Sequence, residues 1–244
     1  MKAIDAVREY IERNESAHKT DIANFLIQKF PGISSSSINW KIHNLLKDST
    51  IASTGRGIYI ATRNKDFRPD ISDLMSKTGN FMNENFPELE YTIWDTRIMN
   101  DFTTHQIARY SVILEVERGA EESIFNFLVD IFSDVFLSPT KKEYQLYVSN
   151  KEYPVIIKPL ISQSPKMKIS GIKVPKLEKI LVDLIVDHAL FTPFQGNEMV
   201  TIFRNAFTTY NINVNTLKRY AGRRGAKGKL TTFLDNFHIA NHLR

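Results

Sequence analysis

The sequence predicts a mixed α/β protein of the α+β kind, with a small amino-terminal domain over residues 1–62 and a larger mixed domain over 70–244 that ends in helices. Three observations support this prediction. Apolar residues recur at helical spacing in three short amino-terminal segments, strand-length β-branched runs then alternate with helical segments, and helical spacing returns near the carboxyl end. The polar stretch 62–70, which contains Pro69, is typical of a linker between domains.

Three helices are expected in the first domain. The first covers residues 3–14, where apolar side chains repeat at helical spacing. Thr20 is expected to cap a second helix, which Pro31-Gly32 ends. The serine run 34–37 caps a third helix that ends near Asp48.

A short hairpin is expected after the third helix. Two strand-like runs, 51–53 and 58–61, flank Thr54-Gly55-Arg56-Gly57, whose glycines permit the positive φ values of a tight turn. Three helices and a hairpin in this order resemble a winged helix-turn-helix domain. In that family the third helix reads the major groove of DNA and the hairpin, or wing, contacts the backbone or minor groove.

The third helix has two different faces. Ile38, Ile42 and Leu45 fall on one arc and are predicted to be core, while the opposite arc is polar and carries Trp40. No acidic residue occurs over 34–47, and the groups present can bond to base edges and phosphates. The predicted DNA contacts are Ser35, Ser36, Ser37, Asn39, Trp40, Lys41, His43, Asn44, Lys47 and, on the wing, Arg56. A winged helix that only docks other proteins remains an alternative.

Composition limits the possible classes of protein. The net charge of +5 permits nucleic-acid binding without requiring it. The chain has no cysteine, which excludes disulfides and thiolate chemistry and suits a reducing compartment. The first residues do not resemble a signal sequence, and no apolar run approaches the length of about 20 residues that crosses a bilayer. We therefore expect a soluble, cytoplasmic protein without membrane contact.

The larger domain is expected to contain a sheet of at least three strands covered by helices. Strand-length apolar runs bounded by turn residues alternate with helical patterns, which favours an α/β or α+β arrangement. Strands are expected over 91–94, 111–116 and 155–160, and helices over 71–86, 120–136, 177–185, 198–210, 214–224 and 230–243.

Catalytic motifs are absent from the sequence, so no catalytic residue, metal or cofactor is predicted. One alternative rests on Asp95, Glu115 and Glu117, which resemble the acidic strand ends of the PD-(D/E)xK nucleases. Paired carboxylates of this kind hold Mg²⁺. The sequence departs from that pattern, because Glu117 stands where the family has lysine and Trp94 stands where it has proline. Lys158 could replace the lysine only in a displaced geometry.

The densest basic cluster lies near the end of the chain. Its cations could contact the DNA backbone or an acidic protein partner, or they could be a solvated helix end. The residues of this cluster are Lys218, Arg219, Arg223, Arg224 and Lys227.

A helix start near residue 175 resembles that of the AbiEi-type antitoxins, which combine an amino-terminal winged helix with a larger carboxy-terminal domain. The matching residues are Pro175, Glu178, Lys179, Leu181, Asp183 and Leu184. The resemblance implies a repressor of its own promoter that counteracts a nucleotidyltransferase toxin encoded by a neighbouring gene and is not itself an enzyme. From the residues alone, Asp183 beside Lys179 is interpreted as a surface ion pair on an amphipathic helix.

Overall fold

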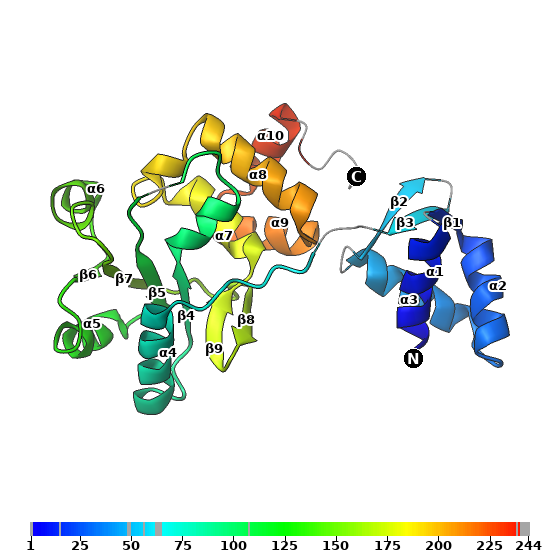
Figure 1. The fold of residues 1–244 in the computed structure, drawn as a ribbon, viewed down its shortest axis with the longest axis horizontal. Coiled ribbons are helices and arrows are strands. Elements are labelled where there is room, and N and C mark those ends of the chain that lie inside the picture. Colours follow the sequence, from blue (N-terminus) through cyan, green and yellow to red (C-terminus); the bar gives the residue numbers. More distant parts are fainter. Residues whose placement is uncertain are drawn as a thin grey trace. The chain divides into compact units, whose positions relative to one another are not determined.

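The protein is a mixed α/β protein, as the sequence predicts (Figure 1). It divides into two compact units. Unit 1 contains Met1–Asp66, Ala206–Asn215 and Leu234–Arg244, and unit 2 contains Phe67–Asn205 and Thr216–Phe233. The computed structural model describes residues 2–14, 16–47, 50–55, 57–61, 65–106, 108–237 and 239.

Unit 1 contains the three predicted helices, the predicted hairpin and one further strand. Its elements in order are α1 (Ala3–Asn14), β1 (Ser16–His18), α2 (Lys19–Lys29), α3 (Ser35–Lys47), β2 (Ile51–Gly55) and β3 (Ile58–Ala61). The strands pair antiparallel in the order β1-β3-β2. Strand β1 was not predicted, because three residues are too few to show an alternating pattern.

The two helix caps predicted in unit 1 differ in outcome. Thr20 lies inside α2, and His18 is the residue before that helix, without a side-chain cap, so the prediction for Thr20 was wrong. At α3 the backbone N–H of Ser37 donates to the Ser34 hydroxyl at 3.2 Å, so the serine run does cap the helix.

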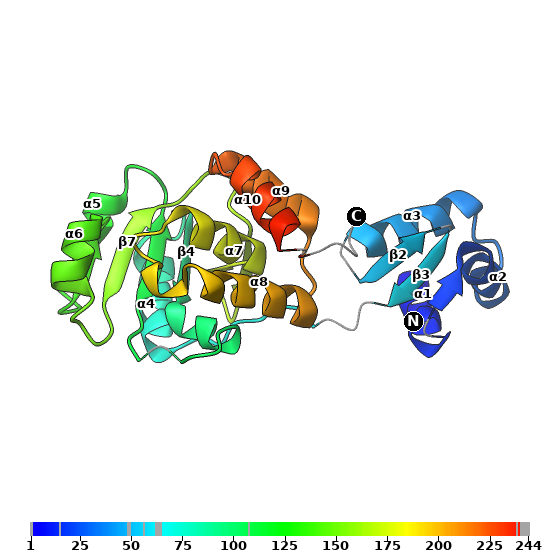
Figure 2. The same ribbon diagram turned by 90° about the horizontal axis from the view of Figure 1, so that it is seen from above.

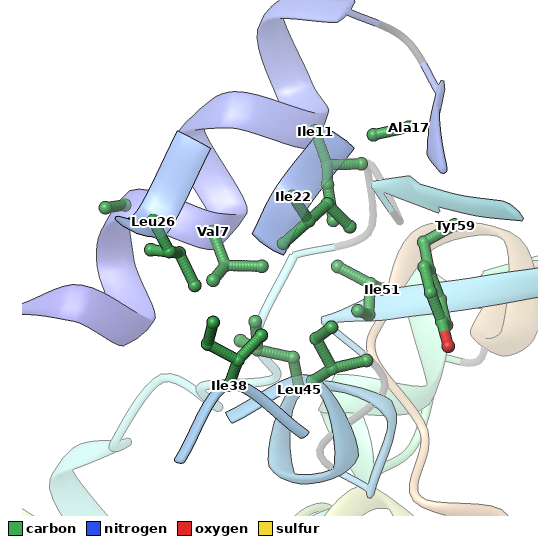
Figure 3. Packing of buried hydrophobic residues seen from close by; sticks show 11 residues of the cluster. Val7, Ile11, Ala17, Ile22, Leu26, Ile38, Leu45, Ile51 and Tyr59 are labelled. Carbon is green, nitrogen blue, oxygen red and sulfur yellow. The ribbon is translucent and has the colours of Figure 1, made fainter. Parts of the chain in front are cut away.

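The core of unit 1 lies between α1, α2, α3 and the small sheet. Figure 3 shows Ile38 and Leu45 of α3 pointing toward Val7, Ile22 and Ile51. Because Ile38 and Ile42 are buried, the opposite face of α3 is turned toward solvent. The packing of α3 therefore follows the predicted division into an apolar and a polar arc.

Unit 2 is built on a four-stranded sheet with the order β4-β5-β7-β6. Its strands are β4 (Tyr91–Asp95), β5 (Val112–Val116), β6 (Val135–Leu137) and β7 (Val155–Pro159). Strand β4 is antiparallel to β5, while β5, β7 and β6 run parallel to one another. A separate antiparallel pair, β8 (Lys166–Ile169) and β9 (Ile172–Pro175), was not predicted.

Helices α4 (Asp73–Asn85) and α5 (Glu121–Val129) of unit 2 pack against strands of this sheet. Unit 2 also contains α6 (Lys141–Glu143) and α7 (Leu177–Val186), while α8 (Asn197–Thr209), α9 (Val214–Arg223) and α10 (Lys227–Asn236) each extend into unit 1. The helix predicted over 120–136 is too long, because α5 ends at Val129 and Phe136 lies in β6. None of the helices in the described part of the chain is long and apolar enough to cross a membrane.

Helix α7 occupies the centre of unit 2. Figure 2 shows it between the sheet and α9, and an ion pair connects it to β5 while a hydrogen bond from Tyr220 connects it to α9. Every residue from Leu177 to Ile185 is buried, so α7 is not the amphipathic surface helix that the sequence predicted. Its charged side chains must therefore find partners inside the unit.

Candidate functional site

The outer face of α3 is the exposed polar face that the sequence predicted. Trp40 is 60% exposed, which is unusual for so large an apolar side chain on a well-packed small unit. The Lys41 ammonium lies 5.5 Å from the centre of the Trp40 ring, so a cation borders the indole. No acidic residue occurs along this helix. The face combines aromatic, amide, hydroxyl and cationic groups, which can contact bases and phosphates.

The structure places most of the predicted DNA-contacting residues on one surface. Ser35, Ser36, Asn39, Trp40 and His43 are exposed, while Ser37, Lys41 and Asn44 are half-buried. The Ser34 and Ser36 hydroxyls are hydrogen-bonded to each other at 2.9 Å at the start of the helix. The side chain of Lys47 and the whole of Arg56 lie outside the described residues, so the predicted contacts by Lys47 and Arg56 stay predictions.

The basic cluster near α9 is only partly available to a partner. Lys218, Arg219, Arg223 and Lys227 are exposed, although Arg223 donates to the Gln163 side chain at 2.6 Å. Arg224 was predicted with them and is different. Its side chain is 10% exposed and pairs with the buried carboxylate of Asp183 and the half-buried carboxylate of Asp187, so the prediction that Arg224 contacts DNA or a partner was wrong.

A row of polar side chains, buried at Thr92 and Glu115 and half-buried at Lys158, crosses the sheet of unit 2. Thr92 on β4 lies opposite Glu115 on β5, and Glu115 lies opposite Lys158 on β7. Because directly opposed residues of neighbouring strands point to the same face, all three project toward one side of the sheet. The Thr92 hydroxyl donates to the Glu115 carboxylate at 3.1 Å.

Helix α7 presents a matching stripe to this row. Lys179 and Asp183 lie in α7, and Asp187 directly follows it. The three residues are spaced four apart, which is about one helical turn, so their side chains lie on one side of the helix. The Lys179 ammonium, which is 0% exposed, pairs with Glu115 and, at 2.5 Å, with Asp183. Lys158 pairs with Asp187. The interpretation of Asp183 and Lys179 as a surface pair was therefore wrong, because the pair is buried.

Residues at and just after α9 complete the group. The Tyr220 hydroxyl donates to Asp183 at 3.0 Å, and Arg224 donates to Asp187 at 2.6 Å while lying 3.4 Å from Asp183. Charges of opposite sign now alternate through the unit. We call this set the buried ionic chain, and its members in order are Glu115, Lys179, Asp183, Arg224, Asp187 and Lys158.

The pKa values follow from these contacts. Burial by itself lowers the pKa of Lys179, but Asp183 and Glu115 outweigh it, and the pKa lies above its ordinary value. Burial raises the pKa of Asp187, but Lys158 and Arg224 outweigh it, so the pKa lies below its ordinary value. These two shifts favour the charged forms of Lys179 and Asp187, whereas burial raises the pKa of Asp183 above its ordinary value although Lys179 opposes it.

The three carboxylates considered for a nuclease do not come together. Asp95 lies opposite Val112, three positions along β5 from Glu115 and on the other face of the sheet. Its carboxylate accepts from the Arg97 N–H at 2.8 Å and from the Tyr153 hydroxyl, and burial first, then the bond to Asp95, raises the pKa of Tyr153 to about 12. Glu117 is exposed beyond the strand. Within the described ranges, no three His, Asp or Glu side chains are placed to hold a metal ion.

Sequence reasoning missed the buried ionic chain. Two signals were present. Glu115 and Lys158 each interrupt a strand-length apolar run, and Lys179, Asp183 and Asp187 repeat every fourth residue through a very apolar helix to the residue just after it. A charged residue inside an apolar strand, together with residues of opposite charge on a helix, indicates that the two form an ion pair inside the protein.

The fold and the site define a two-unit α+β protein with an exposed polar helix on the smaller unit and a buried ionic chain in the larger one. A family described as a family of unknown function (DUF6577) matches residues 37–240, so the chain belongs to that family. The match begins within α3 and extends through the hairpin and all of unit 2. No curated protein matches the chain.

Proposed function

We propose that the protein is a sequence-selective DNA-binding repressor whose amino-terminal unit is a winged helix. The observation that carries the proposal is the exposed face of α3, where Trp40 stands 60% exposed among hydroxyl, amide and cationic groups. In the proposed complex Asn39 and Trp40 contact base edges in the major groove. Ser35, Lys41 and His43 contact phosphates.

The order of elements in unit 1 supports this proposal. Three helices are followed by a hairpin, and β1 joins that hairpin to make a three-stranded sheet. Within unit 1, Ile38, Ile42 and Leu45 hold α3 against the core, while Ser36, Asn39 and Trp40 on its outer face are exposed. The wing, with Arg56 at its predicted tip, would contact the neighbouring backbone.

We further propose that repression serves a toxin–antitoxin pair, in which this protein is the antitoxin of a nucleotidyltransferase toxin and acts in the cytoplasm. The support is the resemblance of the start of α7 to the AbiEi-type antitoxins. The structure adds that Lys179 and Asp183 of this motif are buried. They would therefore maintain the fold of unit 2 and would not contact the toxin.

A gel-shift titration tests DNA binding. The full chain is titrated with the DNA upstream of its own gene and with a scrambled duplex of the same composition. We expect selective binding that weakens steeply with salt, because each phosphate contact releases counterions. Asn39→Ala should reduce the preference for the upstream DNA, while Asn24→Ala, an exposed asparagine on α2, should not. Equal binding to both duplexes would contradict sequence selectivity.

A separate experiment tests the antitoxin role. Cells that express the neighbouring gene alone are compared with cells that also express this chain, with growth as the measurement. We expect the chain to restore growth, and Asn39→Ala to restore it equally when both genes have foreign promoters. Growth arrest in both cultures would refute the antitoxin role and leave DNA binding unaffected.

A further inference from the structure

A pocket of about 330 Å³ lies at one end of the buried ionic chain. Ser138 directly follows β6, Lys158 is near the end of β7 and Asp187 directly follows α7, and all three line the pocket. It therefore opens beyond the carboxyl ends of two parallel strands, a common place for ligands in α/β sheets. The remaining walls are largely apolar and include Ile156 and Leu190. Its volume falls at the lower end of small-molecule sites.

The charge at this end of the chain is positive. The buried ionic chain alternates from Glu115, which lies deep in unit 2, to Lys158, which lies in the wall of the pocket. Among the described residues that line the pocket, Lys158 is the one Lys or Arg. Its ammonium has three N–H donors and gives one to Asp187. A negative group in the pocket would continue the alternation of charge.

The carboxylate in the pocket wall does not oppose an anion strongly. Asp187 is paired with Lys158 on one oxygen and with Arg224 on the other. Two cations thus neutralise it, and both of its oxygens are occupied. A ligand cation would have to compete with these internal partners, whereas a ligand anion would meet the unused donors of Lys158.

Ser138 adds an observation of a different kind. Its φ of 41° lies in the left-handed region, which costs energy for a residue with a side chain. The strained backbone places this serine at the pocket wall, immediately after β6. Its hydroxyl is 3.4 Å from the Ile157 carbonyl, a weak hydrogen bond that a ligand acceptor could replace.

We propose that this pocket binds a small organic carboxylate whose acid group pairs with Lys158 and whose compact apolar body packs against Ile156 and Leu190. A single negative charge fits better than a phosphate dianion, because one lysine faces the pocket and Asp187 lies beside it. The proposal is independent of DNA binding, since all the residues involved belong to unit 2.

The test uses benzoate as the probe and the methyl NMR signals of Ile156 and Leu190 in the full chain as the readout. We expect saturable shifts with benzoate. Benzamide, a neutral molecule of the same shape, and phenyl phosphate should each bind at least about tenfold more weakly. Failure of benzoate to give a saturable shift, or equal affinity for benzamide, would overturn the proposal.

Variants locate the binding and separate it from folding. Lys158→Met should weaken benzoate binding about tenfold or more, while Lys142→Met, an exposed lysine on α6, should not change it. Ala189→Leu leaves the ionic chain intact and should block the pocket by filling it. If Lys158→Met unfolds unit 2, Ala189→Leu still tests whether benzoate binds in this pocket. Unchanged benzoate binding by Ala189→Leu would refute the site.

Discussion

Lys179→Met should destabilise unit 2 far more than an ordinary lysine substitution does. The Lys179 side chain is 0% exposed and pairs with two carboxylates, Glu115 and Asp183. Asp183 keeps Tyr220 and Arg224 after the substitution, but among the described residues Glu115 keeps only the Thr92 hydroxyl as a hydrogen-bond partner. One buried carboxylate is thus left without a cation, and breaking a buried pair in this way costs about 3–5 kcal/mol of the free energy of unfolding.

A second substitution tests the cause. Glu115→Gln removes the stranded charge, and its amide can still accept from Thr92. The double variant Lys179→Met with Glu115→Gln should therefore recover most of the loss and return to within about 1–2 kcal/mol of the parent, because a buried pair is often replaceable by neutral groups.

The assay is urea unfolding followed by Trp94 fluorescence in a Trp40→Phe background. Trp94 lies on β4 and is 2% exposed, so it reports on unit 2. Lys142→Met serves as the exposed control and should change the free energy of unfolding by less than about 0.5 kcal/mol. A cost below about 1 kcal/mol for Lys179→Met would match an exposed ion pair and refute the reasoning, as would a double variant no more stable than the single one.

Two further predictions concern the packing and the pH dependence of unit 2. Gly79→Ala should destabilise unit 2 in thermal unfolding although alanine favours helix, because the added Cβ would lie 2.8 Å from Ile172 Cγ2. The control is Gly222→Ala in α9, whose added Cβ would have no heavy atom within 4 Å and which should be neutral or stabilising. The pKa of Asp187 in the folded protein lies below its unfolded value of about 3.9. The ionised Asp187 therefore stabilises the folded state above about pH 3.9, and this contribution is lost as the pH falls through the folded-state pKa. Asp187→Asn should therefore be less stable than the parent at pH 7 and lose less stability on acidification, and parallel pH profiles would contradict this.

The sequence predicts helices of unit 1 well because their apolar spacing and their burial coincide. Residues 3–14 were expected as a helix, and α1 has these bounds. In α3 the predicted core residues Ile38, Ile42 and Leu45 are all buried. Here each side chain faces either core or solvent, so one periodic pattern decides both the element and its orientation.

The sequence does not predict the structure correctly where charged side chains are buried or where lysines alternate with apolar residues in a short strand. Helix α7 looked amphipathic because Lys179 and Asp183 are charged, yet they are buried with partners from other elements. Such partners lie far away in sequence, so no local pattern shows them. Strand β8 alternates Lys166 and Lys168 with apolar residues on a four-residue run, too short and too polar to be distinguished from a loop.

The indole N–H signals of the two tryptophans provide the most direct measurement of the proposed DNA contact. Trp40 lies on the exposed face of α3, and Trp94 is buried in unit 2. During an NMR titration of the full chain with its upstream DNA, we expect the Trp40 signal to shift to saturation and the Trp94 signal to stay in place. A DNA complex that leaves the Trp40 signal unchanged would contradict the assignment of α3 as the recognition helix.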